Sequence, residues 1–179
     1  ATLTLNSPQT LNALSDAVMQ ALHDRLDAIA ETPEIRSVIL TAAGKAFCAG
    51  HNLKEMTAGR QASDGGQVYF RDLFGRAAAL LQRIQTLPQP VIAQVHGVAA
   101  AAGCQLVASC DMAVAAHGTR FCVNGVNIGL FCSTPLVALS RNVPRKKSCE
   151  LRTAGRFIAG ERAQSSRHVN KSHEVETLV

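Results

Sequence analysis

Aromatic residues, charges and long apolar runs are all scarce in this chain. Of its 179 residues none is Trp, one is Tyr and 17% are charged, whereas 47% are hydrophobic. The longest apolar stretch, Val98 to Ala108, is interrupted by Gly103 and Gln105 and is shorter than the ~20 residues that cross a bilayer. These proportions exclude a disordered or collagen-like chain and predict one soluble domain without a membrane span.

The six cysteines lack the spacing of a metal site or a redox pair. None forms a C-x-x-C motif, and none lies in a Cys/His cluster of zinc spacing. Without a sign of secretion, such cysteines are typical of reduced and mostly buried thiols. We therefore predict no bound metal and a reducing compartment.

The net charge of +5 comes from the last part of the chain. Residues 1–140 carry nine Lys/Arg and nine Asp/Glu, whereas residues 141–179 carry nine against four. A nucleic-acid module would place clustered aromatic side chains or a known reading motif beside its basic patch, but Phe157 is the one aromatic residue after position 140. The sequence therefore predicts no nucleic-acid partner.

Segments with strand and helix patterns alternate along the chain. We expect strands at residues 2–6, 37–41, 91–95 and 112–115. Helices are expected after the capping residue Ser15 and over residues 66–87, 102–109 and 136–141. For the last of these, Ser133 or Thr134 followed by Pro135 has the pattern of a helix start. This βαβα order predicts an α/β fold with a mainly parallel sheet and function at the loops that follow its strands.

Two of these loops are rich in Gly and Ala and lead from a strand into a helix, at residues 44–56 and 95–105. N–H groups at a helix start carry partial positive charge, so two such turns that face each other could hold an oxygen on which negative charge develops. The alternative is that the small residues only allow tight packing of helices against the sheet. Composition alone favours that alternative.

The order of residues in the loops is more specific than their composition. Residues 45–56 read KAFCAGHNLKEM, residues 90–97 read PVIAQVHG, and residues 101–111 read AAGCQLVASCD. With LNSPQTLNAL at residues 5–14, these segments resemble the signatures of the enoyl-CoA hydratase/isomerase, or crotonase, superfamily. The resemblance covers residues 1–147, and residues 101–111 with GLFCSTP at 129–135 are similar to its branch called enoyl-CoA hydratase domain-containing protein 3.

This resemblance implies a crotonase-like (ClpP/crotonase) α/β fold with a ββα spiral core, and an acyl-CoA or enoyl-CoA thioester as ligand. By position in the motifs, the backbone N–H groups of His51 and Ala102 would form an oxyanion hole that stabilises a thioester enolate. Asn52, Leu53 and Lys54 fall where the family lines the path of CoA and the acyl chain. Because CoA enters as part of the substrate, no separate cofactor is expected.

The usual catalytic acids of a hydratase are absent from the matched positions. Family members use two glutamates as paired acid and base. The first falls here at Gln105 and the second at Gly125, and relatives with an acid further along are matched by Cys132 and Ser133. We therefore expect weak or absent hydration, with Ser133 as a weak catalytic candidate. The alternative to the backbone role of His51 is that its side chain acts as a catalytic base.

Residues 148–179 depart from the family pattern. Arg152, Ser166, Arg167 and His168 occupy places where apolar or Gly residues are expected, and a charge in a core position is costly unless it reaches water. We expect an altered, poorly ordered tail that lacks the C-terminal helical region of family trimers, with a divergent but packed ending as the alternative. A homo-oligomer, a trimer or hexamer in the family, is still expected.

Other reactive side chains have structural interpretations. Asp111, at a helix-to-strand junction, is expected to cap or to stabilise structure, and Cys104, Cys122 and Cys132 to be packed thiols. His96 is expected in a turn with a satisfied ring, with a position facing the cavity as the alternative. Two classes remain, an enolate-stabilising enzyme and a non-catalytic CoA-ester-binding or structural relative. Either would reside in a bacterial cytoplasm or the mitochondrial matrix, without secretion.

Overall fold

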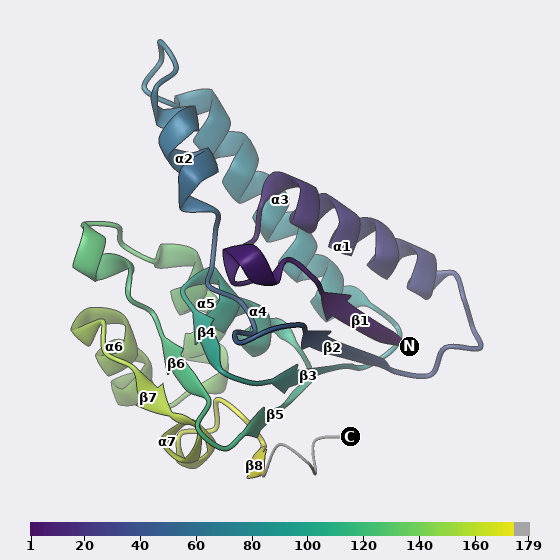
Figure 1. Cartoon of the computed structure of the whole chain (residues 1–179). Coiled ribbons are helices and arrows are strands. Elements are labelled where there is room, and N and C mark those ends of the chain that lie inside the picture. The colour runs from purple at the N-terminus through teal and green to yellow at the C-terminus, as the bar shows by residue number, and fades with distance from the viewer. Residues whose placement is uncertain (174–179) are drawn as a thin grey trace.

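The structure, a computed structural model, describes residues 1–173. Its larger sheet has five strands in the order β1-β2-β3-β5-β8 (Figure 1). These strands are Thr2–Leu5, Val38–Ala42, Val91–Val95, Met112–Ala116 and Lys171–His173. All neighbouring strands of this sheet run parallel, because the helices between them return the chain to the edge where it started. The predicted α/β class with a parallel sheet is therefore confirmed.

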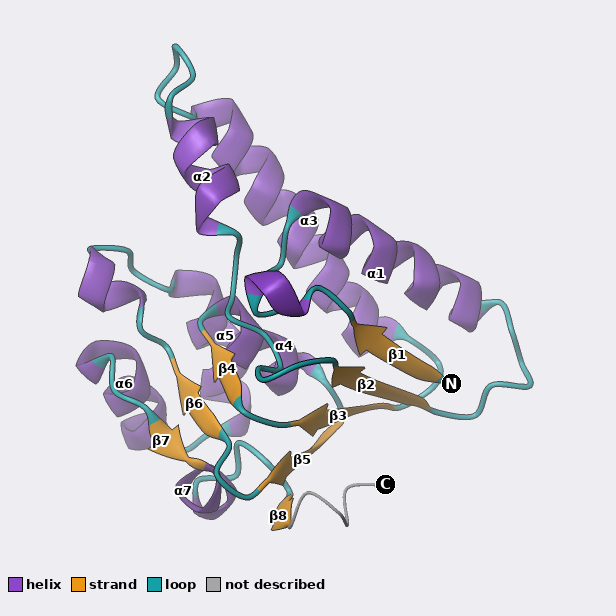
Figure 2. Ribbon diagram, in the orientation of Figure 1, coloured by secondary structure: helices purple, strands orange, loops and turns teal. Residues whose placement is uncertain are grey.

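A smaller sheet of three strands lies beside the larger one, in the order β4-β6-β7. Its strands are Val98–Ala100, Arg120–Cys122 and Ile158–Ala159. The helices are α1 Asp16–Ala30, α2 Leu53–Arg60, α3 Gln67–Thr86, α4 Ala102–Ser109, α5 Ser133–Asn142, α6 Arg145–Ala154 and α7 Gly160–Ser165. Figure 2 shows α1 and α3 side by side along β1 and β2, and α6 and α7 beside β7.

The predicted helices form where capping and apolar spacing agree. The Ser15 hydroxyl accepts a hydrogen bond from Val18 N at 3.2 Å, which caps α1 as predicted. The helix α3 buries the expected stripe, namely Leu73, Ala77, Leu80, Leu81 and Ile84. In the described part of the chain, no helix has the length and apolar character that crossing a bilayer requires.

The start of α5 differs from the prediction. The helix begins at Ser133 itself, with Cys132 in the capping position and no side-chain capping bond, so Pro135 is the third helical residue. A proline is tolerated there because the first-turn N–H groups have no intrahelical acceptor. Neither Ser133 nor Thr134 is therefore the cap.

Residues 148–173 form regular structure, which differs from the expected poorly ordered tail. Leu151, Ile158, Ala163 and Val169 are buried in the common core. The strand β8 pairs with β5 at the edge of the larger sheet, and β7 pairs with β6. The apolar residues that remain in this segment are enough to attach it, while Arg152 lies over the Phe131 ring at 5.4 Å instead of in the core. Residues 174–179 of the expected tail lie outside the described residues.

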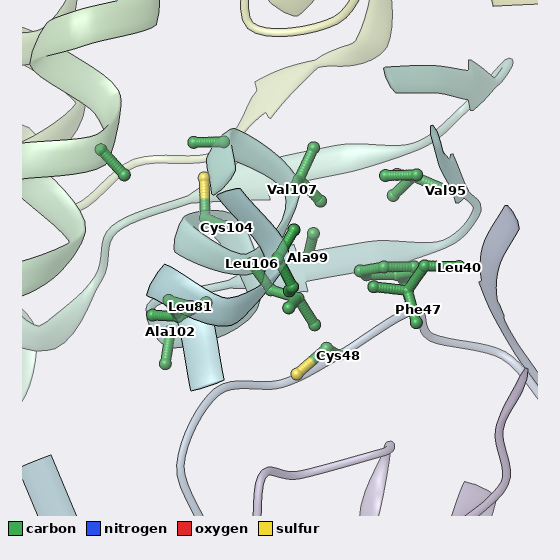
Figure 3. Packing of buried hydrophobic residues seen from close by; sticks show 14 of the residues in the cluster. Leu40, Phe47, Cys48, Leu81, Val95, Ala99, Ala102, Cys104, Leu106 and Val107 are labelled. Carbon is green, nitrogen blue, oxygen red and sulfur yellow. The ribbon is translucent and has the colours of Figure 1, made fainter. Parts of the chain in front are cut away.

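The helix α4 is buried along its whole length and packs directly on the first Gly/Ala-rich loop. Figure 3 shows Cys48 of that loop close to Ala99 and to Leu106 of α4. A Cβ atom added to Gly103 would lie 2.3 Å from the Cys48 carbonyl oxygen. Only a glycine therefore allows the loop and the helix to approach this closely, and this approach positions the candidate site.

Candidate functional site

Backbone hydrogen bonds join the two Gly/Ala-rich loops. Cys48 N donates to the Val98 carbonyl at 3.1 Å, and Ala100 N donates to the Cys48 carbonyl at 2.9 Å. The chain then turns at Gly50, whose φ of 98° favours glycine. A Cβ atom on Gly50 would lie 3.4 Å from Ala102 N, so the backbone before His51 lies against the start of α4.

The N–H group of His51 points away from the strand-like segment at Leu14. Leu14 N donates to Gly50 O at 2.8 Å and Asn52 N donates to Leu14 O at 3.3 Å. In an extended chain the N–H groups of successive residues point to opposite edges. The His51 N–H group lies between these two bonds and therefore points to the side opposite Leu14. That side faces residues 98–102.

The N–H group of Ala102 is the first of α4. First-turn N–H groups have no intrahelical acceptor, so this donor is available to a ligand. The preceding Ala101 has φ 48° and ψ −115°, a rare conformation for a residue with a Cβ atom, and its N–H donates to the Cys122 carbonyl at 2.9 Å. The surrounding structure thus holds a strained turn immediately before the donor.

Glu55 fixes the chain on the other side of His51. One carboxylate oxygen accepts from Asp16 N at 3.0 Å, and the other accepts from the Asn52 side chain at 3.1 Å. Asn52 in turn caps α2, because its side-chain oxygen accepts from Lys54 N at 3.0 Å. The starts of α1 and α2 are therefore tied together around the segment that carries the His51 N–H group.

A cavity of about 380 Å³ opens beside these two backbone groups. It brings together four predicted site residues, His51, Ala102, Gly125 and Ser133, with Leu53 from α2. Its remaining walls are mostly apolar, and the described residues that line it include no Asp or Glu. The sequence reasoning had not singled out Met56, Phe74, Ile128, Leu130 or Phe131, whose apolar character alone does not distinguish cavity walls from core.

The His51 imidazole is packed against the apolar wall. Its ring meets the Phe74 ring edge to face with centroids 5.8 Å apart, and its Nδ1 atom is buried without a hydrogen-bond partner among residues 1–173. Burial lowers the pKa of His51, with weaker opposing effects from the Leu14 backbone and the Asp16 carboxylate. An uncharged ring at neutral pH follows.

Gln105 does not line this first cavity. It lies on the wall of a second, adjoining cavity of about 190 Å³ between α3, α4 and α5. The two cavities share Phe74 and Thr134. The two predicted glutamate positions therefore line different cavities, Gly125 the first and Gln105 the second.

Gly125 leaves no room for a side chain. A Cβ atom there would lie 2.4 Å from the Leu130 carbonyl oxygen and 2.5 Å from Cys132 Sγ. The loop that follows the 3-10 turn Gly125–Ile128 thus occupies the space where a glutamate side chain would begin. The motif spacing predicted a missing acid at Gly125, but the loop packing against this position could not be predicted from it.

Asn52 and Lys54 lie outside the first cavity. Asn52 is half-buried and acts as the α2 cap, whereas Lys54 is exposed on the surface next to Leu53, Thr57 and Ala58. Of the three predicted path residues, Leu53 alone lines both the cavity and this surface.

The remaining reactive groups have the structural roles that were predicted. Asp111 accepts a hydrogen bond from Val91 N at 2.7 Å. Burial raises the pKa of Cys104 far above its ordinary value and that of Cys122 to about 11, so both are packed thiols. Burial likewise raises the pKa of Cys132. The half-buried His96 ring contacts the Gly44 carbonyl of the first loop through Nε2 at 2.7 Å, so this ring nitrogen has a partner.

Comparison with known proteins agrees with the fold and the motifs. The family model for enoyl-CoA hydratase/isomerase matches residues 1–178. The chain is 50% identical over 159 residues to the mitochondrial enoyl-CoA hydratase domain-containing protein 3 of Xenopus laevis, covering 89% of this chain and 52% of that protein. The human protein of the same name is 43% identical over 161 residues, covering 90% of this chain and 52% of its own length.

Solved structures extend this agreement to three dimensions. The crystal structure of an enoyl-CoA hydratase from Mycobacterium smegmatis superposes with a TM-score of 0.94 at 51% identity, covering 99% of this chain and 67% of that one. Human enoyl-CoA hydratase domain-containing protein 3 gives a TM-score of 0.92 at 38% identity, with 99% and 68% covered. The chain spans about half the length of the curated relatives it matches. Its fold is the crotonase fold, and the chain belongs to the enoyl-CoA hydratase/isomerase family.

Proposed function

We propose that the protein binds acyl-CoA or enoyl-CoA thioesters and polarises the thioester carbonyl with the backbone N–H groups of His51 and Ala102. The observation that carries the proposal is the 380 Å³ cavity, which both residues line. The thioester oxygen would accept from both donors, and the first carbons of the acyl chain would lie against Phe74.

Such donors suit a reaction that passes through an enolate. When a proton leaves or joins the carbon next to the thioester carbonyl, negative charge moves onto the carbonyl oxygen. Donors that are already aimed at that oxygen lower the barrier without reorganising. The strained Ala101 turn and the Glu55 bonds supply this preorganisation, because they hold the two donors before a ligand arrives.

Hydration at the usual rate of the family is not part of the proposal. The walls of the first cavity carry no carboxylate among the residues described, and general acid–base catalysis by a positioned group contributes roughly 10²–10⁴-fold. We expect a slow hydratase or isomerase. The second candidate is a non-catalytic thioester-binding protein, which the filled position at Gly125 favours.

Assembly and location are proposals of the same kind. Exposed apolar side chains outside the two cavities, at Val68, Met112 and Phe157, support self-association, as a trimer or hexamer. The curated relatives from Xenopus laevis and human are named mitochondrial, and a similar solved structure is bacterial. We propose the mitochondrial matrix or a bacterial cytoplasm.

The test is a titration with a short 2-enoyl-CoA, following binding by calorimetry and hydration by loss of the enoyl absorbance. Ala102→Pro removes one donor at a helix position that accepts proline, and we expect thioester binding to fall by about tenfold or more. His51→Ala keeps its backbone N–H and should retain binding. Normal binding by Ala102→Pro would overturn the oxyanion assignment.

A ligand variant makes the same test without changing the protein. An S-alkyl-CoA thioether has the chain and the nucleotide of the thioester but no carbonyl oxygen. We expect the wild-type protein to bind it at least about fivefold more weakly than the matched acyl-CoA. Equal affinities would show that no group holds the carbonyl. This comparison remains decisive if Ala102→Pro fails to fold, which thermal unfolding would reveal.

A further inference from the structure

We propose that the second cavity binds a carboxylate at the far end of the acyl group, so that the preferred ligand is an ω-carboxyacyl-CoA of about five to eight carbons. The inference rests on the proposed function, since the thioester must be held at His51 and Ala102. It adds a ligand class and a second recognition site.

Three helices, α3, α4 and α5, each contribute one face to the walls of this cavity. Thr134, Val137, Ala138 and Arg141 of α5 line it, at the i, i+3, i+4 and i+7 spacing of a single helix face. The α3 helix contributes residues at the same kind of spacing, namely Phe74, Ala77, Ala78, Leu81, Gln82 and Gln85. Gln105 and Ser109 of α4 continue the face on which Ala102 begins.

The three faces run in the same direction away from the first cavity. Phe74 and Thr134 line both cavities, so they mark the near end. Along α4, Gln105 is ~4.5 Å and Ser109 ~10.5 Å from Ala102, at a rise of 1.5 Å per residue. Ser109, Gln85 and Arg141 therefore gather at the far end, at the distance that an extended acyl chain reaches from the oxyanion donors.

The polarity of the lining changes along this path. Ala77, Ala78, Leu81 and Ala138 provide apolar contact for methylene groups. Carboxamides, a hydroxyl and one guanidinium follow, and no acidic side chain lines the cavity among the described residues. A cavity that combines apolar walls with hydrogen-bond donors and a cation fits a chain with a carboxylate at its end.

Two of the polar groups have no other partner. Gln105 is 9% exposed, and its carboxamide makes no hydrogen bond within residues 1–173. Arg141 forms no ion pair with any residue that the structure describes. The Gln105 amide can therefore donate a hydrogen bond to a ligand without breaking one inside the protein. The carboxylate at the far end would accept from the Arg141 guanidinium, while the Gln105 amide faces the chain nearer the thioester.

The position of Arg141 is set by the packing of α5 on α4. The side chain of the next residue, Asn142, donates to the Ala108 carbonyl at 2.9 Å and so ties the ends of the two helices together. This bond places Arg141 beside Ser109 instead of leaving it on a free helix end. The exposed Arg141 side chain therefore lines the far end of the second cavity.

The test measures binding by calorimetry for matched pairs of thioesters, glutaryl-CoA against pentanoyl-CoA, adipyl-CoA against hexanoyl-CoA, and suberyl-CoA against octanoyl-CoA. At the best length we expect the ω-carboxyacyl ligand to bind about tenfold more tightly than its partner. Arg141→Met should remove this preference. Arg145→Met, which loses the same charge outside the cavity, should keep it.

The outcomes separate this inference from the function on which it rests. If the monocarboxylic thioesters bind and no length shows a preference for the second carboxylate, the subsite is refuted and the proposed function stands. An equal loss of preference in Arg141→Met and Arg145→Met would refute it as well, because long-range attraction would then explain the affinity. If no thioester binds, the proposed function fails and the subsite fails with it.

Discussion

Replacing Gly103 with Ala should destabilise the protein, because the new methyl group meets the backbone of the first loop. The added Cβ atom would lie 2.3 Å from Cys48 O and 2.8 Å from Cys48 Cβ. A normal contact would require these atoms to move apart by about 1 Å, and overpacking of this kind costs roughly 1–3 kcal/mol. Replacing Gly with Ala within a helix stabilises the helix by at most about 1 kcal/mol, which offsets part of this cost.

The expected net loss is therefore about 1–2 kcal/mol in the free energy of unfolding. For a domain of this size that loss lowers the midpoint of thermal unfolding by about 3–6 °C. Because Gly103 follows Ala102 and Cys48 lies three residues before His51, the same displacement moves both proposed donors. Thioester affinity should fall together with stability.

Gly75→Ala is the matched control. Gly75 also lies within a helix, α3, and a Cβ atom there would meet no heavy atom within 4 Å. The substitution should raise the free energy of unfolding by about 0.5–1 kcal/mol through helix propensity alone. Thermal and urea unfolding of both variants measure the difference. A Gly103→Ala protein as stable as the wild type would refute the close approach of α4 and the loop.

Two further predictions concern buried titratable groups. Burial lowers the pKa of His168 to about 4, and its Nε2 atom lies 3.3 Å from Cys104 Sγ. Because the unfolded chain binds this proton near pH 6.5, the free energy of unfolding should fall by on the order of 3 kcal/mol between pH 6.5 and 4. His168→Gln should flatten denaturation profiles in that window, and an unchanged slope would contradict the assignment. Separately, a maleimide should label the exposed Cys149 rapidly at neutral pH, whereas Cys48 is buried and its pKa is raised to about 12. Mass spectrometry that detects a second label at a similar rate would disprove this pattern.

Local patterns in the sequence were sufficient for α1, α3, α4 and α5 and for β1, β2, β3 and β5, whereas the strands of the smaller sheet and β8 were not predicted. The α4 helix forms over the predicted residues, and α1 begins at its predicted cap, because capping and apolar spacing act within a few residues. The order of the two loop motifs likewise predicted His51 and Ala102 as backbone donors, and both residues line the first cavity. The motif spacing also predicted Gln105 and Gly125 at the positions of the usual acids.

Packing between distant segments decided the rest. Residues 158–159 and 171–173 join sheets whose partners lie about 40–60 residues earlier, and no local pattern encodes that pairing. The same applies to the loop that fills the space at Gly125 and to the helix faces that place Gln105 in a second cavity. The sequence by itself determined the locally patterned helices and strands and the motifs of the family, since these depend on neighbouring residues. The tertiary structure alone decided which side chains share a cavity, because that depends on contacts between segments far apart in the chain.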